Sequence, residues 1–121
     1  MPPSNPTDVV TAFVTRGEEL LVLRRSERVG THRGRWAGVS GYLEAIPPEA
    51  QARVELAEEL GLEEADVALR AAGAPFVVDD PDGARSWRVH PFRFELGPGA
   101  SPRLDWEHTE LRWIRPEEMS A

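Results

Sequence analysis

The first apolar runs along the chain predict a β-hairpin. Residues 8–15 are rich in β-branched and aromatic side chains, residues 16–18 interrupt the run, and residues 19–24 are apolar again. The segment 25–35 that follows is polar, rich in arginine and punctuated by glycine, which is typical of a loop. We therefore expect two antiparallel strands followed by a long connection.

The second half of the chain predicts another hairpin and a last short strand. The apolar-rich run 66–78, the turn sequence 79–83 and the alternating run 86–96 form the expected hairpin, and residues 110–114 predict the last strand. Upstream, the glycine-containing run 36–43 predicts a brief strand whose backbone comes close to another group.

A helix is predicted in the middle of the chain, over residues 48–60. Pro47 and Pro48 open it, because proline is tolerated where the first amides of a helix have no intrahelical partner. Gly61 stands at the usual C-terminal stop position.

Hairpins combined with one well-formed helix predict the fold class α+β, a mixed sheet packed against that helix and a short C-terminal helix starting at Pro116. The chain has 121 residues, which is the size of one domain. We expect a single domain over residues 1–121, with residues 1–6 flexible.

The acidic residues of the middle helix are predicted to share one side. At 100° per residue, Glu55, Glu58 and Glu59 fall within an arc of about 100° and converge. Their mutual repulsion would be offset by a divalent cation, and oxygen ligands favour Mg²⁺ or Mn²⁺. Taken alone, the same pattern also suits the solvated face of a surface helix. The arc expected to pack on the sheet holds Val54, Ala52, Leu56, Ala57 and Leu60.

Composition excludes several classes of function. With 21 acidic and 14 basic residues the formal charge is −7, which disfavours long nucleic acids and anionic membranes as partners. The absence of cysteine excludes a disulfide framework, a thiolate zinc site and a thiol nucleophile. No apolar run approaches the ~20 residues of a membrane span, and the N-terminus lacks a basic region followed by an apolar core. We expect a cytoplasmic protein.

The residues around the middle helix resemble the Nudix box, the loop–helix–loop motif of the Nudix hydrolases. The chain reads Gly41-x-x-Glu44, ten residues, and then Glu55-Leu-Ala-Glu58-Glu59-Leu-Gly61-Leu62. The family pattern is G-x5-E-x7-R-E-apolar-x-E-E-x-G-apolar. The first hairpin, the Gly-Arg-Trp sequence at 34–36 and the sequence 112–118 are also similar to the family, so the resemblance spans roughly residues 8–119.

The resemblance implies a Nudix-like fold and Mg²⁺- or Mn²⁺-dependent hydrolysis of a nucleoside diphosphate linked to another group. Glu55, Glu58 and Glu59 match the helix carboxylates that hold the metal and position or deprotonate the attacking water. The expected substrate is a nucleotide-type small molecule, and family members often form homodimers.

Family members often supply one more metal-binding carboxylate from a later loop. Here Glu107 is the predicted one, ahead of Glu110. The neighbouring His108 is interpreted either as a proton shuttle or as a structural residue.

Substrate contacts are predicted upstream of the helix. Guanidinium groups suit phosphate oxygens, so Arg24 and Arg25 at the end of the first hairpin are candidates for holding a diphosphate. Trp36 is a candidate for stacking on a base. Gly41 and Glu44, in the loop of the box, are also predicted to bind substrate.

The box has one residue fewer than the family pattern between Glu44 and Glu55, and it departs from that pattern at two further positions. The glutamate expected three residues after Glu44 is Pro47, and the arginine expected immediately before Glu55 is Val54. That arginine would lie four residues before Glu58 and could orient it by an ion pair.

Two functions therefore stay open. One is a working pyrophosphohydrolase, and the other is a catalytically weak or inactive Nudix-fold domain that binds a nucleotide or a protein partner. The discriminating feature is whether Glu58 has a basic partner from elsewhere, such as Arg33 or Arg35.

Overall fold

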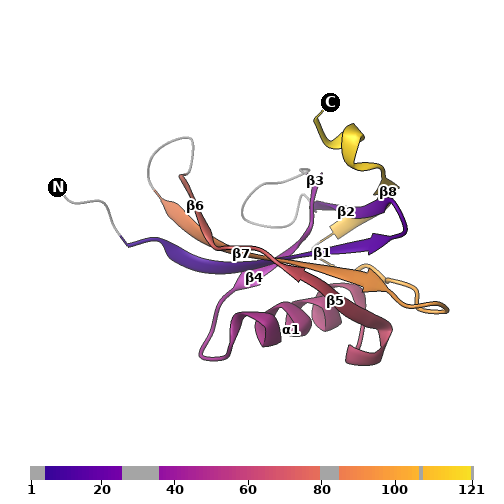
Figure 1. Cartoon of the computed structure of the whole chain (residues 1–121), viewed down its shortest axis with the longest axis horizontal. Coiled ribbons are helices and arrows are strands. Elements are labelled where there is room, and N and C mark those ends of the chain that lie inside the picture. The colour runs from indigo at the N-terminus through magenta and orange to yellow at the C-terminus, as the bar shows by residue number, and fades with distance from the viewer. Residues whose placement is uncertain (1–4, 26–35, 80–84, 107, 121) are drawn as a thin grey trace.

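Strand β1 (Thr7–Arg16) is the strand around which a mixed sheet is built (Figure 1). The computed structural model of the chain describes residues 5–25, 36–79, 85–106 and 108–120. In chain order, the other elements are β2 (Glu19–Arg25), β3 (Trp36–Ala37), β4 (Val39–Tyr42), α1 (Pro48–Leu60), the 3₁₀ helix η1 (Glu64–Asp66), β5 (Val67–Ala72), β6 (Phe76–Asp79), β7 (Ser86–Leu96), β8 (His108–Ile114) and the 3₁₀ helix η2 (Pro116–Ser120).

The sheet contains both parallel and antiparallel pairs. Strand β1 runs parallel to β7, from Thr7 beside Trp87 to Thr15 beside Glu95, and antiparallel to β4. Strands β5 and β6 pair antiparallel with β7. Strand β2 follows β1 through a hairpin and pairs antiparallel with β3 and β8. This mixed sheet, with α1 on one face, confirms the α+β prediction (Figure 1).

The core lies between α1 and the central strands. Alternate residues of β1 point to the helix, because successive side chains of a strand face opposite sides of a sheet. Leu56 in the middle of α1 is fully buried there. Its neighbours in the same buried cluster include Val10, Ala12, Val14, Val39, Ala52, Leu60, Phe92 and Phe94.

The predicted helix is confirmed at both ends. Helix α1 spans Pro48–Leu60, and Gly61 adopts the left-handed conformation with φ of 67°. Its backbone N–H donates to Ala57 O, and the N–H of Leu62 donates to Leu56 O, so the last carbonyls of the helix are satisfied. The chain therefore leaves the helix directly after Leu60.

Both predicted hairpins form, but several strands were predicted with the wrong limits. The run 66–78 is divided into η1, β5 and β6, because Gly73 bends the chain close to Pro91 and Pro75 has no N–H for a ladder. The run 36–43 forms two short strands, β3 and β4. The last strand begins at His108, before the predicted residue. The C-terminal helix is a short 3₁₀ helix, η2.

Parts of three predictions lie outside the described residues. They are residues 1–4 of the segment expected to be flexible, residues 26–35 of the arginine-rich loop and residues 80–84 of the turn. None of the helices within the described ranges combines the length and apolar character that a membrane crossing requires.

The β1–β2 turn is tied to β7 by a carboxylate. Glu95 accepts a hydrogen bond from the backbone N–H of Gly17, at 3.0 Å, and another from the Thr15 hydroxyl, at 2.8 Å. The Gly17 bond, followed by the Thr15 bond, lowers the pKa of Glu95 below its ordinary value. Because Gly17 has a φ of 61°, the turn itself also requires glycine.

We expect Glu95→Gln to lower the melting temperature at pH 7. A carboxyl group with a lowered folded-state pKa stabilises the fold above its unfolded-state pKa, and this contribution is lost as pH falls through the folded-state pKa. Thermal melts of wild type and variant should therefore differ at pH 7, and the difference should disappear at an acidic pH below the folded-state pKa of Glu95. Glu64→Gln, in the exposed η1, is the control. An equal difference at both pH values would contradict this account.

Candidate active site

The acidic side chains of α1 lie in three different environments. Glu55 is half-buried, Glu58 is exposed, and Glu59 is 3% exposed. The helix also buries Gln51, whereas Val54 is 38% exposed. The predicted packing face was therefore wrong at its edges, because the buried strip is rotated towards the acidic side.

Gln51 connects Glu55 to the loop that precedes the helix. Its Nε2 donates to Glu55 Oε2 at 2.9 Å, and its Oε1 accepts from the backbone N–H of Glu44 at 3.2 Å. The sequence analysis did not identify this contact. The signal was the spacing of four residues between Gln51 and Glu55, at which helical side chains meet.

Gly41 is the residue of β4 that faces the Glu55 carboxyl group. A Cβ atom built on Gly41 would overlap Glu55, with the carboxyl carbon and Oε1 among the nearest atoms. Gly41 lies beside Val10 of β1, on the face of the sheet that packs against α1. Only glycine leaves room there for the carboxylate, which explains the close approach that the sequence predicted for this run.

Glu59 faces a histidine that comes from the other end of the chain. His108 Nε2 lies 3.6 Å from Glu59 Oε1, and the side chains of His108 and Glu59 are 2% and 3% exposed. On the other side of the ring, His108 Nδ1 bonds to Asp105 Oδ1 at 3.1 Å. A buried ring whose Nδ1 is hydrogen-bonded to Asp105 favours the structural interpretation of His108 over that of a proton shuttle.

Glu58 is the carboxylate of α1 that faces solvent. Within the part of the chain that the structure describes, no hydrogen bond or ion pair reaches it. Arg33 and Arg35, the basic partners considered for it, lie outside that part. Arg53 precedes Val54, which occupies the position of the box arginine. The Arg53 guanidinium does not face Glu58 but lies 3.5 Å from Glu49 and 5.1 Å from the Phe94 ring centre.

The three helix carboxylates do not form a ready-made metal cage. Across residues 5–25, 36–79, 85–106 and 108–120, no three acidic or histidine side chains are grouped closely enough to hold an ion. The expected convergence is thus not seen as a preformed cluster: Glu55 bonds to Gln51, whereas Glu59 faces His108. Their donor chemistry still suits a hard cation, since all the ligand atoms are carboxylate oxygens. Glu107, the fourth predicted ligand, lies outside the described residues.

Three of the predicted substrate-binding residues, Arg24, Arg25 and Trp36, lie on β2 and β3. Arg24 forms an ion pair with Glu110 of β8 at 3.1 Å, so the alternative downstream carboxylate is engaged there. Trp36 is 37% exposed, and the guanidinium of Arg112 lies 4.6 Å from its ring centre. The side chain of Arg25 lies outside the described part of the chain. Their roles in binding substrate stay predictions.

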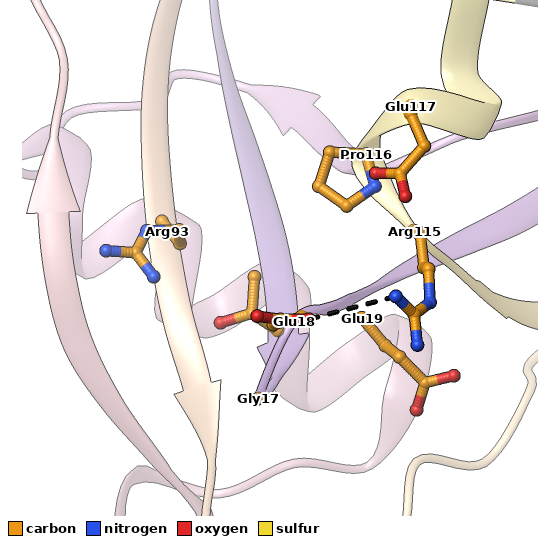
Figure 2. Close-up of a pocket in the computed structure, with 8 residues that line it drawn as sticks. Gly17, Glu18, Glu19, Arg93, Arg115, Pro116 and Glu117 are labelled. Atoms are coloured by element: carbon orange, nitrogen blue, oxygen red, sulfur yellow. Dashed lines mark ion pairs between the residues drawn. The ribbon is translucent and has the colours of Figure 1, made fainter.

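An open pocket of about 410 Å³ lies at the β1–β2 turn, and no residue of α1 lines it (Figure 2). Its charged walls carry both signs, and Arg115 Nη1 lies 3.9 Å from Glu18 Oε2. None of the predicted site residues lines it. The lining residues are Thr15, Gly17, Glu18, Glu19, Arg93, Arg115, Pro116 and Glu117.

Comparison with solved structures places this arrangement in a known fold. The chain superimposes on a Caenorhabditis elegans Ap4A hydrolase with a TM-score of 0.78 at 17% identity, covering 93% of this chain and 82% of the other. It superimposes on a MutT protein from Methanosarcina mazei Go1 with a TM-score of 0.75 at 23% identity, covering 98% and 83%. At these identities the likeness is one of fold.

Sequence comparison extends the likeness to the family. The chain is 34% identical to a putative 8-oxo-dGTP diphosphatase 2 of Mycobacterium tuberculosis over 113 residues, which cover 92% of this chain and 74% of the relative. A sequence model of the NUDIX domain matches residues 5–121. Because this match includes both the acidic helix and the strands that pack on it, the chain belongs to the NUDIX hydrolase family.

Proposed function

We propose that this NUDIX hydrolase is a Mg²⁺- or Mn²⁺-dependent pyrophosphohydrolase that acts on a nucleotide or on a nucleoside diphosphate linked to another group. The observation that carries the proposal is how each carboxylate of α1 is positioned. Glu55 bonds to Gln51 and lies against Gly41 of β4, and Glu59 lies next to His108. Glu58, which lies between these two in the sequence, faces solvent. The chain therefore keeps oriented carboxylates although the box lacks its arginine.

The substrate class follows from the relatives rather than from a pocket. One relative is named a putative 8-oxo-dGTP diphosphatase and a neighbour in fold an Ap4A hydrolase, and both names refer to nucleotides. A nucleotide polyanion approaching a chain of net charge −7 needs local cationic groups. A bound cation and the arginines of the β2 end supply them in this proposal, and the reaction takes place in the cytoplasm.

Glu58 and Glu59 are proposed to hold the metal, with Glu55 and Glu107 completing the ligand set. When bound, a divalent cation neutralises charge on the diphosphate and facilitates attack by water. The chain's own residues bind the cation and orient the reacting groups. Glu58 is open to incoming groups, and the burial of Glu59 beside His108 limits the directions in which its carboxylate can point.

The proposed function predicts metal-dependent hydrolysis of nucleotides. We expect wild-type protein to release phosphate, pyrophosphate or mononucleotide from at least one member of a panel of nucleoside triphosphates, dinucleotides and nucleotide sugars, only when Mg²⁺ or Mn²⁺ is present. Glu58→Gln should weaken Mn²⁺ binding, measured by electron paramagnetic resonance, by about tenfold or more, because ligand charge sets cation affinity. Glu64→Gln, an exposed carboxylate outside α1, is the control.

Two results would overturn the proposal. Folded wild-type protein that binds Mn²⁺ but turns over no compound would favour the alternative of a binding domain. Unchanged Mn²⁺ affinity in Glu58→Gln would show that the metal does not bind at this helix.

The close contact between Gly41 and Glu55 predicts that a larger residue at position 41 lowers activity. We expect Gly41→Ala to lower kcat by roughly 10- to 100-fold, because the added methyl group displaces the Glu55 carboxylate and small misplacements are costly in catalysis. Ser40→Ala, which removes an exposed hydroxyl from the same strand, should retain wild-type activity. Kinetics together with thermal melts check this, and a folded Gly41→Ala variant with full activity would contradict the assigned role of Glu55.

A further inference from the structure

Gln51 is a buried polar residue whose bonds all serve the candidate site. Its side chain belongs to α1, is 3% exposed and lies against the loop after β4. Burying an amide is unfavourable unless its donor and acceptor groups are bonded. Here the donor meets Glu55 and the acceptor meets the backbone of Glu44.

These two bonds fix the orientation of the amide. The backbone N–H of Glu44 can only donate, so it must meet the amide oxygen. The Glu55 carboxylate accepts, so it must meet the amide nitrogen, and the observed distances of 3.2 Å and 2.9 Å agree with that arrangement. The Glu55 carboxyl group is confined between this amide and Gly41.

The chain lacks the arginine that the box carries before Glu55, and Val54 at that position is exposed. Positions 51 and 54 are neighbours on the helix surface, because residues three apart lie on one side. We propose that Gln51 is the positioning residue of this site and holds Glu55 against the Gly41–Glu44 loop in the absence of the box arginine. This inference deepens the proposed function and rests on it.

An amide differs chemically from a guanidinium at this place. It orients the carboxylate through a hydrogen bond but brings no positive charge. Gln51 therefore orients the Glu55 carboxylate without adding a positive charge beside it. The same residue also joins the loop to the helix, so one side chain sets the relative position of Gly41 and Glu55.

Two substitutions separate the two bonds of Gln51. Gln51→Glu keeps the shape and an oxygen for the Glu44 N–H, but replaces the donor to Glu55 by a second carboxylate. Gln51→Leu removes both bonds at similar volume. We expect both variants to lower kcat by about 10- to 100-fold, as is typical when a residue orienting a ligand is lost. KM should change by less than about threefold, since substrate contacts are not removed. Glu49→Gln on the first turn of α1 is the control.

A double-mutant cycle shows whether Gln51 acts through Glu55. In a Glu55→Ala background, Gln51→Leu should lower kcat by less than about twofold more, because the group that it positions is already gone. A purely structural contribution of Gln51 would instead appear in both backgrounds. Thermal melts of all variants establish that they are folded, and Gln51→Glu carries the test if Gln51→Leu is not.

A metal-free measurement reports the contact directly. Gln51 is the only glutamine of the chain and Asn5 the only asparagine, so the side-chain amide region of a ¹H–¹⁵N spectrum holds two pairs of signals. We expect Glu55→Ala to move the Gln51 pair and to speed its hydrogen exchange. The Asn5 pair, from an exposed residue before β1, should not move.

The inference is overturned if the Gln51 signals do not respond to Glu55→Ala, if folded Gln51 variants keep the wild-type kcat, or if the two effects on kcat multiply fully in the double mutant. Absence of turnover in the wild type on every compound would overturn the proposed function instead. In that case the amide spectrum still decides whether Gln51 holds Glu55.

Discussion

Helix α1 packs on the sheet through Ala52, Leu56 and Leu60, and this contact determines where every acidic side chain of the helix points. A helix presents its side chains at fixed angles, so burying one strip sets the direction of the others. The buried strip extends onto the acidic side of the helix, where it takes in Gln51 near the start of α1 and Glu59 near its end. The position of the candidate site is therefore a consequence of core packing.

The two buried polar side chains of this strip, Gln51 and Glu59, both lie beside other polar groups. Gln51 bonds to Glu55 and to the Glu44 backbone, and Glu59 lies beside His108, which Asp105 orients. Removing one partner would leave a buried polar group unsatisfied, which costs about 1–3 kcal/mol. The site is thus held from two sides, by a neutral amide near the start of α1 and by an imidazole near its end.

The sequence predicted the elements whose signals are local. Proline before residue 48 and Gly61 after the helix placed both ends of α1, and the box pattern identified the family. The rotation of the buried strip could not be predicted, because it depends on how β1 and β4 approach the helix. The contact between Glu59 and His108 gave no local signal either, since the two residues are far apart in sequence and meet only when β8 pairs with β2.

The central claim is that the carboxylates of α1 hold a catalytic cation although the box has lost its arginine. A crystal structure of the protein soaked with Mn²⁺ and a non-hydrolysable nucleotide analogue, with anomalous scattering data, tests it most directly. The account predicts an anomalous peak bound by Glu58 and Glu59, with phosphate oxygens on its open side. A peak elsewhere, or nucleotide bound with no metal at this helix, would contradict it.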